Sequence, residues 1–199
     1  MISVRRVRYI NWGLPHERMI IALTGTIASG KGEVADYLKK KNFQYFMYSD
    51  VLRDIAKHKG ISATRANLHK IGKEIKEKMK DPGYLSKRLL KKITKKKAIV
   101  DGVRNVGEIE ELKKKKDVHV IGVTAPQRER FARLLKRGRE GDPSTFAEFK
   151  RIDNIENRGK TKGQQINACL DAADFHIYNN KTIKQLHKEI DAILEKISS

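Results

Sequence analysis

The sequence predicts an α/β domain whose parallel sheet carries helices on both faces. Short apolar runs of strand length alternate along the 199 residues with longer stretches in which apolar residues recur every three or four positions. The run at 20–24 is almost continuously apolar and ends at Gly25, which suits a strand buried on both sides. No internal repeat, low-complexity linker or second domain interrupts this pattern, so a single domain is expected.

The first half of the chain begins this alternation of strands and helices. Val34, Ala35 and Leu38 follow helical spacing after the first strand. Further helical patterns follow, and the sequence Asp81-Pro82-Gly83 stops the longest of them. The elements expected up to residue 93 are strands at 20–24 and 43–48, and helices at 31–41, 50–57, 68–79 and 85–93.

The second half of the chain continues in the same way. Pro126 stands where a first helical residue is expected, and Asp142 before Pro143 marks another helix start, with Asp142 as its cap. Cys169 lies in the apolar phase of a helix and is expected in the core. The other expected elements are strands at 98–101, 118–124 and 175–178, and helices at 106–112, 126–135, 142–152 and 183–194.

The net charge of +20 favours polyanionic partners, such as nucleotides, nucleic acid or an anionic membrane surface. A solvated, lysine-rich surface of a heat-adapted protein is the alternative. Much of the charge lies in three runs that close or flank expected elements, as lysines at helix ends and in loops do: Lys39 to Lys41, Lys95 to Lys97 and Lys113 to Lys116.

The single cysteine excludes an internal disulfide and fits a reducing, cytoplasmic location. No apolar run approaches the roughly 20 residues that a membrane-spanning helix needs. Residues 1–18 are basic, and they carry polar residues, Gly13 and Pro15 where a signal peptide needs an apolar stretch. We therefore expect an N-terminal extension at 1–18 and one functional domain at 19–199.

The sequence Gly25-Thr26-Ile27-Ala28-Ser29-Gly30-Lys31, here called the phosphate loop, fits the pattern G-x-x-x-x-G-K. It follows an expected strand and opens an expected helix, which is the context that the pattern requires. Its glycines let successive N–H groups surround a phosphate, and its lysine neutralises the γ-phosphate of ATP during transfer. The residues expected to bind ATP are Gly25, Ile27, Ala28, Ser29, Gly30, Lys31, Gly32 and Glu33.

One position departs from this pattern and bears on Mg²⁺. Gly32 stands where Ser or Thr normally offers a hydroxyl to the metal, so water, Ser29 or an acidic side chain must replace that contact. Asp101, at the end of an apolar strand, is the expected Mg²⁺ ligand, and the alternative is that it caps the helix at Val106. The six histidines are dispersed without ligand-like spacing, so no zinc site is expected.

Two segments that follow strands are candidates for binding the acceptor of the phosphoryl group. Asp50 could accept a hydroxyl proton and Arg53 could pair with a phosphate, although Asp50 could instead cap its helix. Arg104 follows the third strand as a second phosphate clamp, and Gly102 gives the backbone room. Because strand C-termini line the ligand crevice of a parallel sheet, these side chains are expected to converge.

Five arginines follow the fourth strand closely, and an arginine-bearing lid supplies mobile positive charge to a phosphoryl group as water leaves. Those at 130, 133 and 137 share one helical face. Arg133 and Arg137 are the two expected to be catalytic, together with Lys31, Asp50 and Arg104. The alternative for the others is an exposed basic helix. The five are Arg128, Arg130, Arg133, Arg137 and Arg139.

Residues 19–180 resemble the P-loop nucleotide kinases around nucleoside monophosphate kinases and dephospho-CoA kinases, and look particularly like archaeal-type adenylate-kinase-like proteins. The resemblance implies a three-layer P-loop kinase fold with a five-stranded parallel sheet, an acceptor-binding helical insert at 51–95 and a lid at 126–160. The matching segments are Leu23 to Ala35, Ser49-Asp50-Val51-Leu52-Arg53, Val100-Asp101-Gly102-Val103-Arg104-Asn105 and Arg133-Leu134-Leu135-Lys136-Arg137-Gly138-Arg139.

The resemblance leaves the acceptor open. Asp50 and Arg53 resemble dephospho-CoA kinases, in which an Asp after the second strand helps to deprotonate a ribose hydroxyl. Arg104 resembles the arginine with which nucleoside monophosphate kinases grip the acceptor phosphate, and a nucleoside or deoxynucleoside monophosphate is the preferred acceptor. An alternative of another class is a nucleotide-dependent RNA or ribosome assembly factor with weak ATPase activity, which the charge and Gly32 favour. The sequence sets no oligomeric state.

Overall fold

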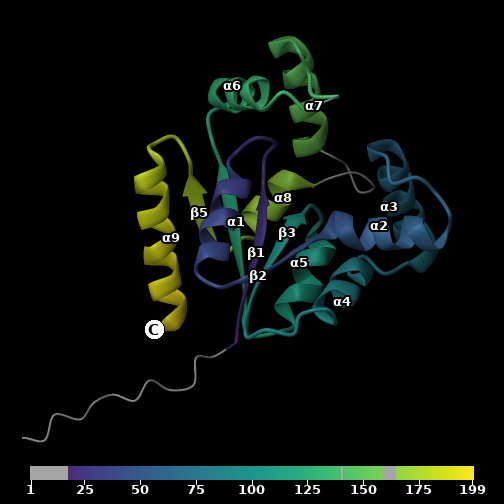
Figure 1. Cartoon of the computed structure of the whole chain (residues 1–199), viewed down its shortest axis with the longest axis horizontal. Coiled ribbons are helices and arrows are strands. Elements are labelled where there is room, and N and C mark those ends of the chain that lie inside the picture. The colour runs from purple at the N-terminus through teal and green to yellow at the C-terminus, as the bar shows by residue number, and fades with distance from the viewer. Residues whose placement is uncertain (1–17, 140, 159–164) are drawn as a thin grey trace, which may run out of the picture.

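The computed structural model describes residues 18–139, 141–158 and 165–199. Five strands form one sheet in the order β2-β3-β1-β4-β5, and all neighbouring strands are parallel (Figure 1). The predicted five-stranded parallel sheet is therefore confirmed. The strands are β1 (Met19–Gly25), β2 (Gln44–Met47), β3 (Lys97–Val103), β4 (Val118–Thr124) and β5 (Phe175–Tyr178).

Helices cover both faces of this sheet, as predicted. Helices α1 and α9 pack with one apolar core, and α2, α4, α5 and α8 pack with the other. Helices α6 and α7 lie beyond the C-terminal ends of the strands, at the top of Figure 1. The helices are α1 (Lys31–Lys40), α2 (Tyr48–His58), α3 (Arg65–Met79), α4 (Tyr84–Leu90), α5 (Val106–Lys113), α6 (Gln127–Arg137), α7 (Phe146–Arg158), α8 (Ile166–Asp171) and α9 (Ile183–Ser198).

The central strand shows why its sequence is almost continuously apolar. Ile20 and Ala22 belong to the core under α4 and α5, whereas Ile21 and Leu23 belong to the core under α1 and α9. All four side chains are fully buried because successive residues of a strand point to opposite faces. Cys169 of α8 is also fully buried in the first of these cores, as predicted.

Two predicted helix starts differ from the structure. Pro126 precedes the first residue of α6 as its cap rather than lying within the helix. The prediction that Asp142 caps the next helix is wrong, because α7 begins four residues later, at Phe146. The Thr145 hydroxyl accepts a hydrogen bond from the N–H of Glu148 there, at 3.2 Å, whereas Asp142 binds the guanidinium of Arg137.

Some predictions fall on residues that the structure does not describe. The expected extension at 1–18 lies outside the described residues except for Arg18, and so do positions 140, 159 and 160 of the expected lid. Among the described helices, none has the length and apolar character that crossing a bilayer requires.

Candidate active site

The phosphate loop connects β1 to α1 in a conformation that requires its glycines. Gly25 and Gly30 have φ angles of +145° and +103°, and Ala28 has a φ of +57°. A Cβ atom at Gly25 would lie 2.0 Å from the backbone oxygen of Val123 in the neighbouring strand. A Cβ atom at Gly30 would lie 2.1 Å from Nδ2 of Asn179. Both motif glycines are thus fixed by close backbone or side-chain neighbours.

Several polar groups of the phosphate loop lack partners. The N–H groups of Ile27, Ala28 and Gly30 make no hydrogen bond within the described residues. The hydroxyls of Thr26 and Ser29 are buried and, in the same part of the chain, also unpaired. Leaving a buried polar group unsatisfied costs about 1–3 kcal/mol. The loop therefore offers a set of free donors that suits a ligand with many acceptor oxygens, such as a phosphate.

Lys31 bridges the loop from the first turn of α1. Its Nζ donates to the carbonyl oxygens of Gly25 and Thr26, at 2.7 and 2.9 Å. Burial lowers the pKa of Lys31 to about 8; the charge of Asp101 opposes this shift and that of Arg104 adds to it. The lysine therefore loses its proton more readily than an exposed lysine does, and an anion bound in the loop would stabilise its charged form.

Asp101 lies in β3, next to Leu23 of β1, and its side chain is 7 % exposed. Its Oδ2 accepts a 2.8 Å hydrogen bond from the hydroxyl of Tyr45 in β2. The alternative role of Asp101 as a helix cap is wrong, because Asn105 caps α5 in a reciprocal pair with Glu108. Asp101 is therefore a buried carboxylate whose charge acts on Lys31.

Gly102 shapes the strand end beside Asp101. Its φ is +87°, and the pairing of β1 with β3 shifts register at this point, so that Thr24 pairs with Val103. A Cβ atom at Gly102 would meet nothing within 4 Å. The position therefore favours glycine for its backbone conformation, and the expectation that it gives the backbone room stays a prediction.

Asp50 and Arg53 form an ion pair with each other in the first turns of α2. Arg53 Nη1 lies 2.8 Å from Asp50 Oδ1 and 2.9 Å from the hydroxyl of Ser49. Both side chains are about half exposed, and Asp50 does not cap the helix, which Met47 precedes. The charge of Asp50 reaches Tyr45, whose pKa is raised first by burial and then by Asp101 and Asp50. The Asp50–Arg53 pair therefore lies within electrostatic reach of Tyr45, the residue that binds Asp101.

Arg104 extends from the end of β3 into solvent. Its charge lowers the pKa of Lys31, so the two cations lie within electrostatic reach of each other. Its carbonyl oxygen accepts a 2.8 Å hydrogen bond from the N–H of Gln165. The structure thus brings Lys31, Asp101 and Arg104 to one end of the sheet.

The two arginines expected to be catalytic lie in different surroundings. Arg133 donates to the carbonyl oxygens of Ser29 and Asn179, at 3.2 and 2.8 Å, so it contacts the phosphate loop directly. Arg137 forms a two-pronged pair with Asp142, at 2.7 and 2.8 Å, and has no contact with the loop among the described residues. Their part in catalysis stays a prediction.

Arg130 is the functional candidate that the sequence underestimates. Its side chain is 6 % exposed, and it contacts both the phosphate loop and Asp153 of α7. The signal available in the sequence is its spacing of four from Leu134, which places both residues on the buried side of α6. Charge alone suggested a solvent-facing residue.

The residues present fit a Mg²⁺ ion with few protein ligands. Mg²⁺ usually takes one or two carboxylates, substrate phosphates and water. Asp101 has one carboxylate oxygen bound to Tyr45, and the unpaired hydroxyl of Ser29 lies in the adjacent loop. Within the described residues, no group of three or more His, Cys, Asp or Glu side chains could enclose a metal. A metal here would therefore depend on the nucleotide for most of its ligands.

Comparison with known sequences gives two results. A family model described as an AAA domain matches residues 21–165. The UPF0200 protein of Pyrococcus abyssi is 34% identical over 189 residues, which cover 90% of this chain and 97% of that protein.

Comparison with solved structures identifies the fold. The protein TT1252 from Thermus thermophilus matches with a TM-score of 0.61 at 16% identity, over 92% of this chain and 100% of that one. The shikimate kinase from Acinetobacter baumannii, in complex with shikimate, matches with a TM-score of 0.58 at 13% identity, over 91% and 95%. At these identities the matches concern the fold alone, and the predicted three-layer P-loop kinase fold is confirmed.

Proposed function

The chain belongs to the UPF0200 protein family and carries its AAA-type P-loop domain, and from this we propose that it is an ATP-dependent phosphotransferase acting on a nucleotide acceptor. The preferred acceptor is a nucleoside or deoxynucleoside monophosphate, and dephospho-CoA is the alternative. The shikimate kinase with a similar fold carries no information on the acceptor, because that match concerns the fold alone.

One observation carries this proposal. Within the described residues, the phosphate loop combines unpaired N–H groups and two buried, unpaired hydroxyls with a lysine whose pKa is lowered to about 8 by its burial. A polyphosphate chain would satisfy the donors and stabilise the charged form of the lysine. Ordinary strand–helix connections have no need of so many unsatisfied groups in one turn.

The residues around the loop would divide the work of the reaction. Lys31 and the loop N–H groups bind the β- and γ-phosphates, and Asp101 would hold Mg²⁺. The metal, when bound, neutralises charge on the phosphates. Arg104, together with Arg53, binds the phosphate of the acceptor. An oxygen of the acceptor phosphate attacks the γ-phosphorus of ATP in line. The bond between that phosphorus and the β–γ bridging oxygen breaks, and ADP leaves with this oxygen.

The Asp50–Arg53 ion pair supports the preference for a monophosphate. A hydroxyl acceptor needs a base to take its proton, and Asp50 would have to leave Arg53 to serve as one. A phosphate acceptor is already anionic and needs no base. In that case Asp50 can keep Arg53 in place while the arginine binds the acceptor.

A panel of acceptors tests the proposal. Nucleoside monophosphates, deoxynucleoside monophosphates and dephospho-CoA are each incubated with the full chain and ATP·Mg²⁺, and labelled product is measured together with ADP. We expect labelled diphosphate from one or more monophosphates. Release of ADP without labelled product from any acceptor would contradict the proposed transfer.

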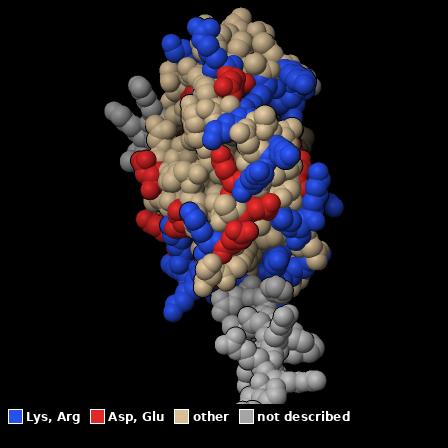
Figure 2. Space-filling model, turned by 90° about the vertical axis from the view of Figure 1, so that its left-hand side faces the viewer, with Lys and Arg blue, Asp and Glu red and all other residues tan. Residues whose placement is uncertain are grey.

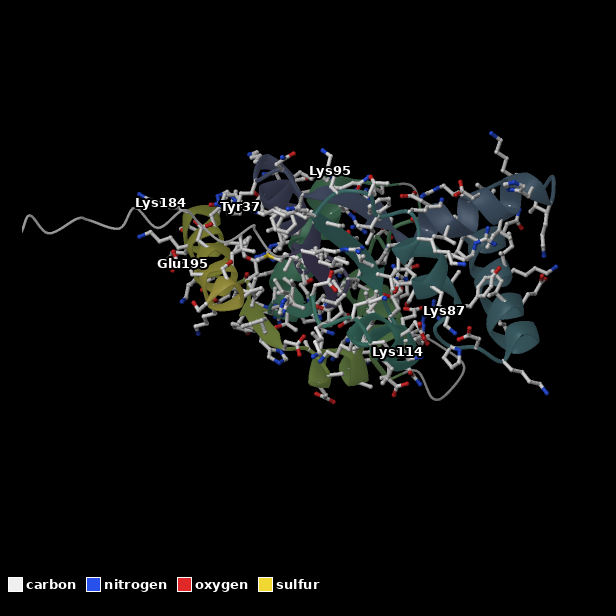
Figure 3. All side chains as sticks on the ribbon, turned by 90° about the horizontal axis from the view of Figure 1, so that it is seen from below. Tyr37, Lys87, Lys95, Lys114, Lys184 and Glu195 are labelled. Atoms are coloured by element: carbon white, nitrogen blue, oxygen red, sulfur yellow. The ribbon has the colours of Figure 1, made fainter. Side chains whose placement is uncertain are left out.

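A second candidate function, RNA binding, is favoured by where the lysine runs lie. Each of the three lysine runs lies just before or at the start of β2, β3 or β4. Because these strands are parallel, the runs lie together at the N-terminal ends of the strands, here called the lysine edge, opposite the phosphate loop. Figure 3 views this end and labels Lys95 and Lys114. Five exposed lysines of the runs have no ion pair within the described residues: Lys40, Lys95, Lys96, Lys115 and Lys116.

The charge is distributed differently on the α9 face. Figure 2 shows blue and red side chains interspersed there. Helix α9 itself carries lysines together with Glu189, Asp191 and Glu195. The lysine edge therefore supports binding of a sugar–phosphate backbone, as an RNA assembly factor would need.

A further inference from the structure

A buried arginine joins helices α6 and α7 to the phosphate loop. Arg130 Nη1 and Nη2 donate to the two carboxylate oxygens of Asp153 at 2.6 and 2.7 Å, which links α6 to α7. Its Nε donates to the carbonyl oxygen of Ala125 at 3.0 Å, and Nη1 also donates to that of Ile27 at 3.1 Å. Three separate segments therefore meet at one guanidinium.

The ion pair at the centre of this network is buried. The side chains of Arg130 and Asp153 are 6 % and 2 % exposed, and the guanidinium carbon lies 5.4 Å from the ring centre of Phe149. Gln127 donates a further 2.8 Å hydrogen bond to Asp153. Burial acts to raise the pKa of Asp153, but the hydrogen bonds from Arg130 and Gln127 outweigh it and keep that pKa below its usual range. The pair is thus charged and rigid.

The contact with Ile27 fixes the direction of an N–H group. The carbonyl of Ile27 and the N–H of Ala28 belong to one planar peptide unit and point in opposite directions. Because Arg130 binds the carbonyl, the N–H of Ala28 is directed away from α6. That N–H is one of those without a partner in the described part of the chain.

The next-but-one peptide unit of the loop is fixed in the same way. Arg133 Nη1 and Asn179 Nδ2 donate to the carbonyl oxygen of Ser29, at 3.2 and 2.9 Å. The N–H of Gly30, which shares that unit, is also unpaired among the described residues. Alternate carbonyls of the loop are therefore bound from the same helix, α6.

We propose that Arg130 is a positioning residue: by binding the carbonyl of Ile27, it keeps the phosphate loop in the conformation that receives a polyphosphate, and Asp153 fixes Arg130 for this task. The inference rests on the proposed function only in taking the loop to bind ATP. Arg130 contacts the outside of the loop, and it acts through Ile27 and Ala28 rather than touching the nucleotide. Without it, the Ile27–Ala28 unit can rotate and present its carbonyl to the phosphate.

The test replaces the ion pair by apolar residues of similar size, as Arg130→Met with Asp153→Leu in the full chain. Such replacements of buried pairs often preserve stability, and this one keeps the net charge. We expect the dissociation constants for ATP and inorganic tripolyphosphate, measured by calorimetry, to rise about tenfold, as for loss of a hydrogen bond from a charged donor. The melting temperature of the ligand-free protein should change little.

Two further variants separate positioning from stability. Arg130→Met alone leaves Asp153 buried without its partner, so it should lower the melting temperature while weakening ATP binding as much as the double variant. Arg130→Lys can pair with Asp153, but its single ammonium lacks the planar fork that also binds Ile27, and it should not restore affinity. Arg130→Lys also tests the inference if the double variant does not fold.

A control variant carries the same chemical change elsewhere. Arg18→Met with Asp117→Leu removes an ion pair of 3.1 Å at the end of the sheet opposite the phosphate loop, and should leave both dissociation constants unchanged. Unchanged affinity in folded Arg130 variants would overturn the inference and leave a purely structural pair. If the wild type bound tripolyphosphate tightly but transferred phosphate to no acceptor, the proposed reaction would fail while the role of Arg130 remained established by binding. A wild type without polyphosphate affinity would overturn both.

Discussion

The hydroxyl of Tyr45 donates a 2.8 Å hydrogen bond to Oδ2 of Asp101 across the neighbouring strands β2 and β3. Burial and the negative charge of Asp101 raise the pKa of Tyr45, so the phenol remains a donor at any pH relevant to the protein. One carboxylate oxygen of Asp101 is therefore fixed. The second has no hydrogen bond within the described residues and is the oxygen that could face a metal or its water.

Replacing Tyr45 tests whether this orientation matters. Tyr45→Phe removes the donor without removing the ring, so Asp101 can rotate. We expect the turnover number to fall about tenfold, consistent with the loss of a typical second-layer contact to a metal ligand, and the Mg²⁺ concentration for half activity to rise. Steady-state kinetics over a Mg²⁺ titration measure both quantities.

The chain offers a matched control for this substitution. Tyr37 also donates a 2.8 Å hydrogen bond to an aspartate, Asp191, but between α1 and α9. Tyr37→Phe should leave the Mg²⁺ dependence unchanged. If the two variants behaved alike, Asp101 would not be the residue that governs metal use.

Gly32 can be given the hydroxyl that it lacks. A Cβ atom there would meet nothing within 4 Å, so Gly32→Ser should fold without strain. We expect half activity at a lower Mg²⁺ concentration, since serine can supply a metal ligand. Gly32→Ala is the control, because it has the same Cβ and no hydroxyl. An equal effect of both substitutions would show that helix propensity, rather than metal binding, is responsible.

Nucleotide affinity should depend on the protonation of Lys31. The free protein has a pKa of about 8 at this lysine, lowered mainly by burial, and only the charged form attracts phosphate. We expect the ATP dissociation constant to be constant below pH 7 and to rise by up to about tenfold per pH unit above 8. In Lys31→Met, affinity should be weak without that rise, and a wild-type profile flat from pH 6.5 to 9.5 would contradict the assignment.

The stability of the ligand-free protein should show the opposite trend. The pKa of Lys31 lies below its ordinary value of 10.5, so the unfolded chain binds this proton more tightly than the folded one. The charged lysine therefore destabilises the fold below pH 8, and this penalty disappears as the pH rises from 8 to 10.5. Denaturant unfolding should find Lys31→Met more stable than wild type at pH 7, with the difference vanishing near pH 10.5.

Much of the fold could be predicted from the sequence because its signals are local. The apolar strands at 118–124 and 175–178, and the phosphate loop between a strand and a helix, depend on neighbouring residues only. The start of α7 could not be predicted in this way. Asp142 is a residue type that often caps helices, but the guanidinium of Arg137, five residues earlier at the end of α6, binds its carboxylate instead.

The candidate site was predictable in its residues and less so in its contacts. Lys31 and Asp101 converge because strand ends meet at one edge of a parallel sheet. The part played by Tyr45 depends on which strand lies beside β3, and that order is not written in any local pattern. The burial of Arg130 likewise depends on Asp153, which lies 23 positions away on another helix.

Asp50 distinguishes the two classes of acceptor. Asp50→Asn removes the charge that pairs with Arg53 and removes any base at this position. With dephospho-CoA as acceptor we expect near-complete loss of activity, because Asp50 would be the general base. With a monophosphate we expect only a moderate loss, up to about tenfold, because Asp50 would only orient the acceptor. Initial rates on both acceptors decide the matter, and equal losses would remove this argument for a monophosphate.

RNA binding through the lysine edge should depend steeply on salt. We expect replacement of Lys95, Lys96, Lys115 and Lys116 by glutamine to weaken binding of single-stranded RNA and to reduce the slope of log affinity against log salt, by roughly 0.7 per lost phosphate contact. Fluorescence anisotropy measures both. Lys184→Gln with Lys188→Gln on α9 is the control, and RNA binding that is absent or indifferent to salt would contradict this second function.

Calorimetric titration of the full chain with ATP is the most direct test of whether residues 25–31 bind a triphosphate. The account predicts one ATP per chain, competition by inorganic tripolyphosphate, and much weaker binding of ATP by Lys31→Met. A correctly folded wild type that binds neither ATP nor tripolyphosphate would contradict it.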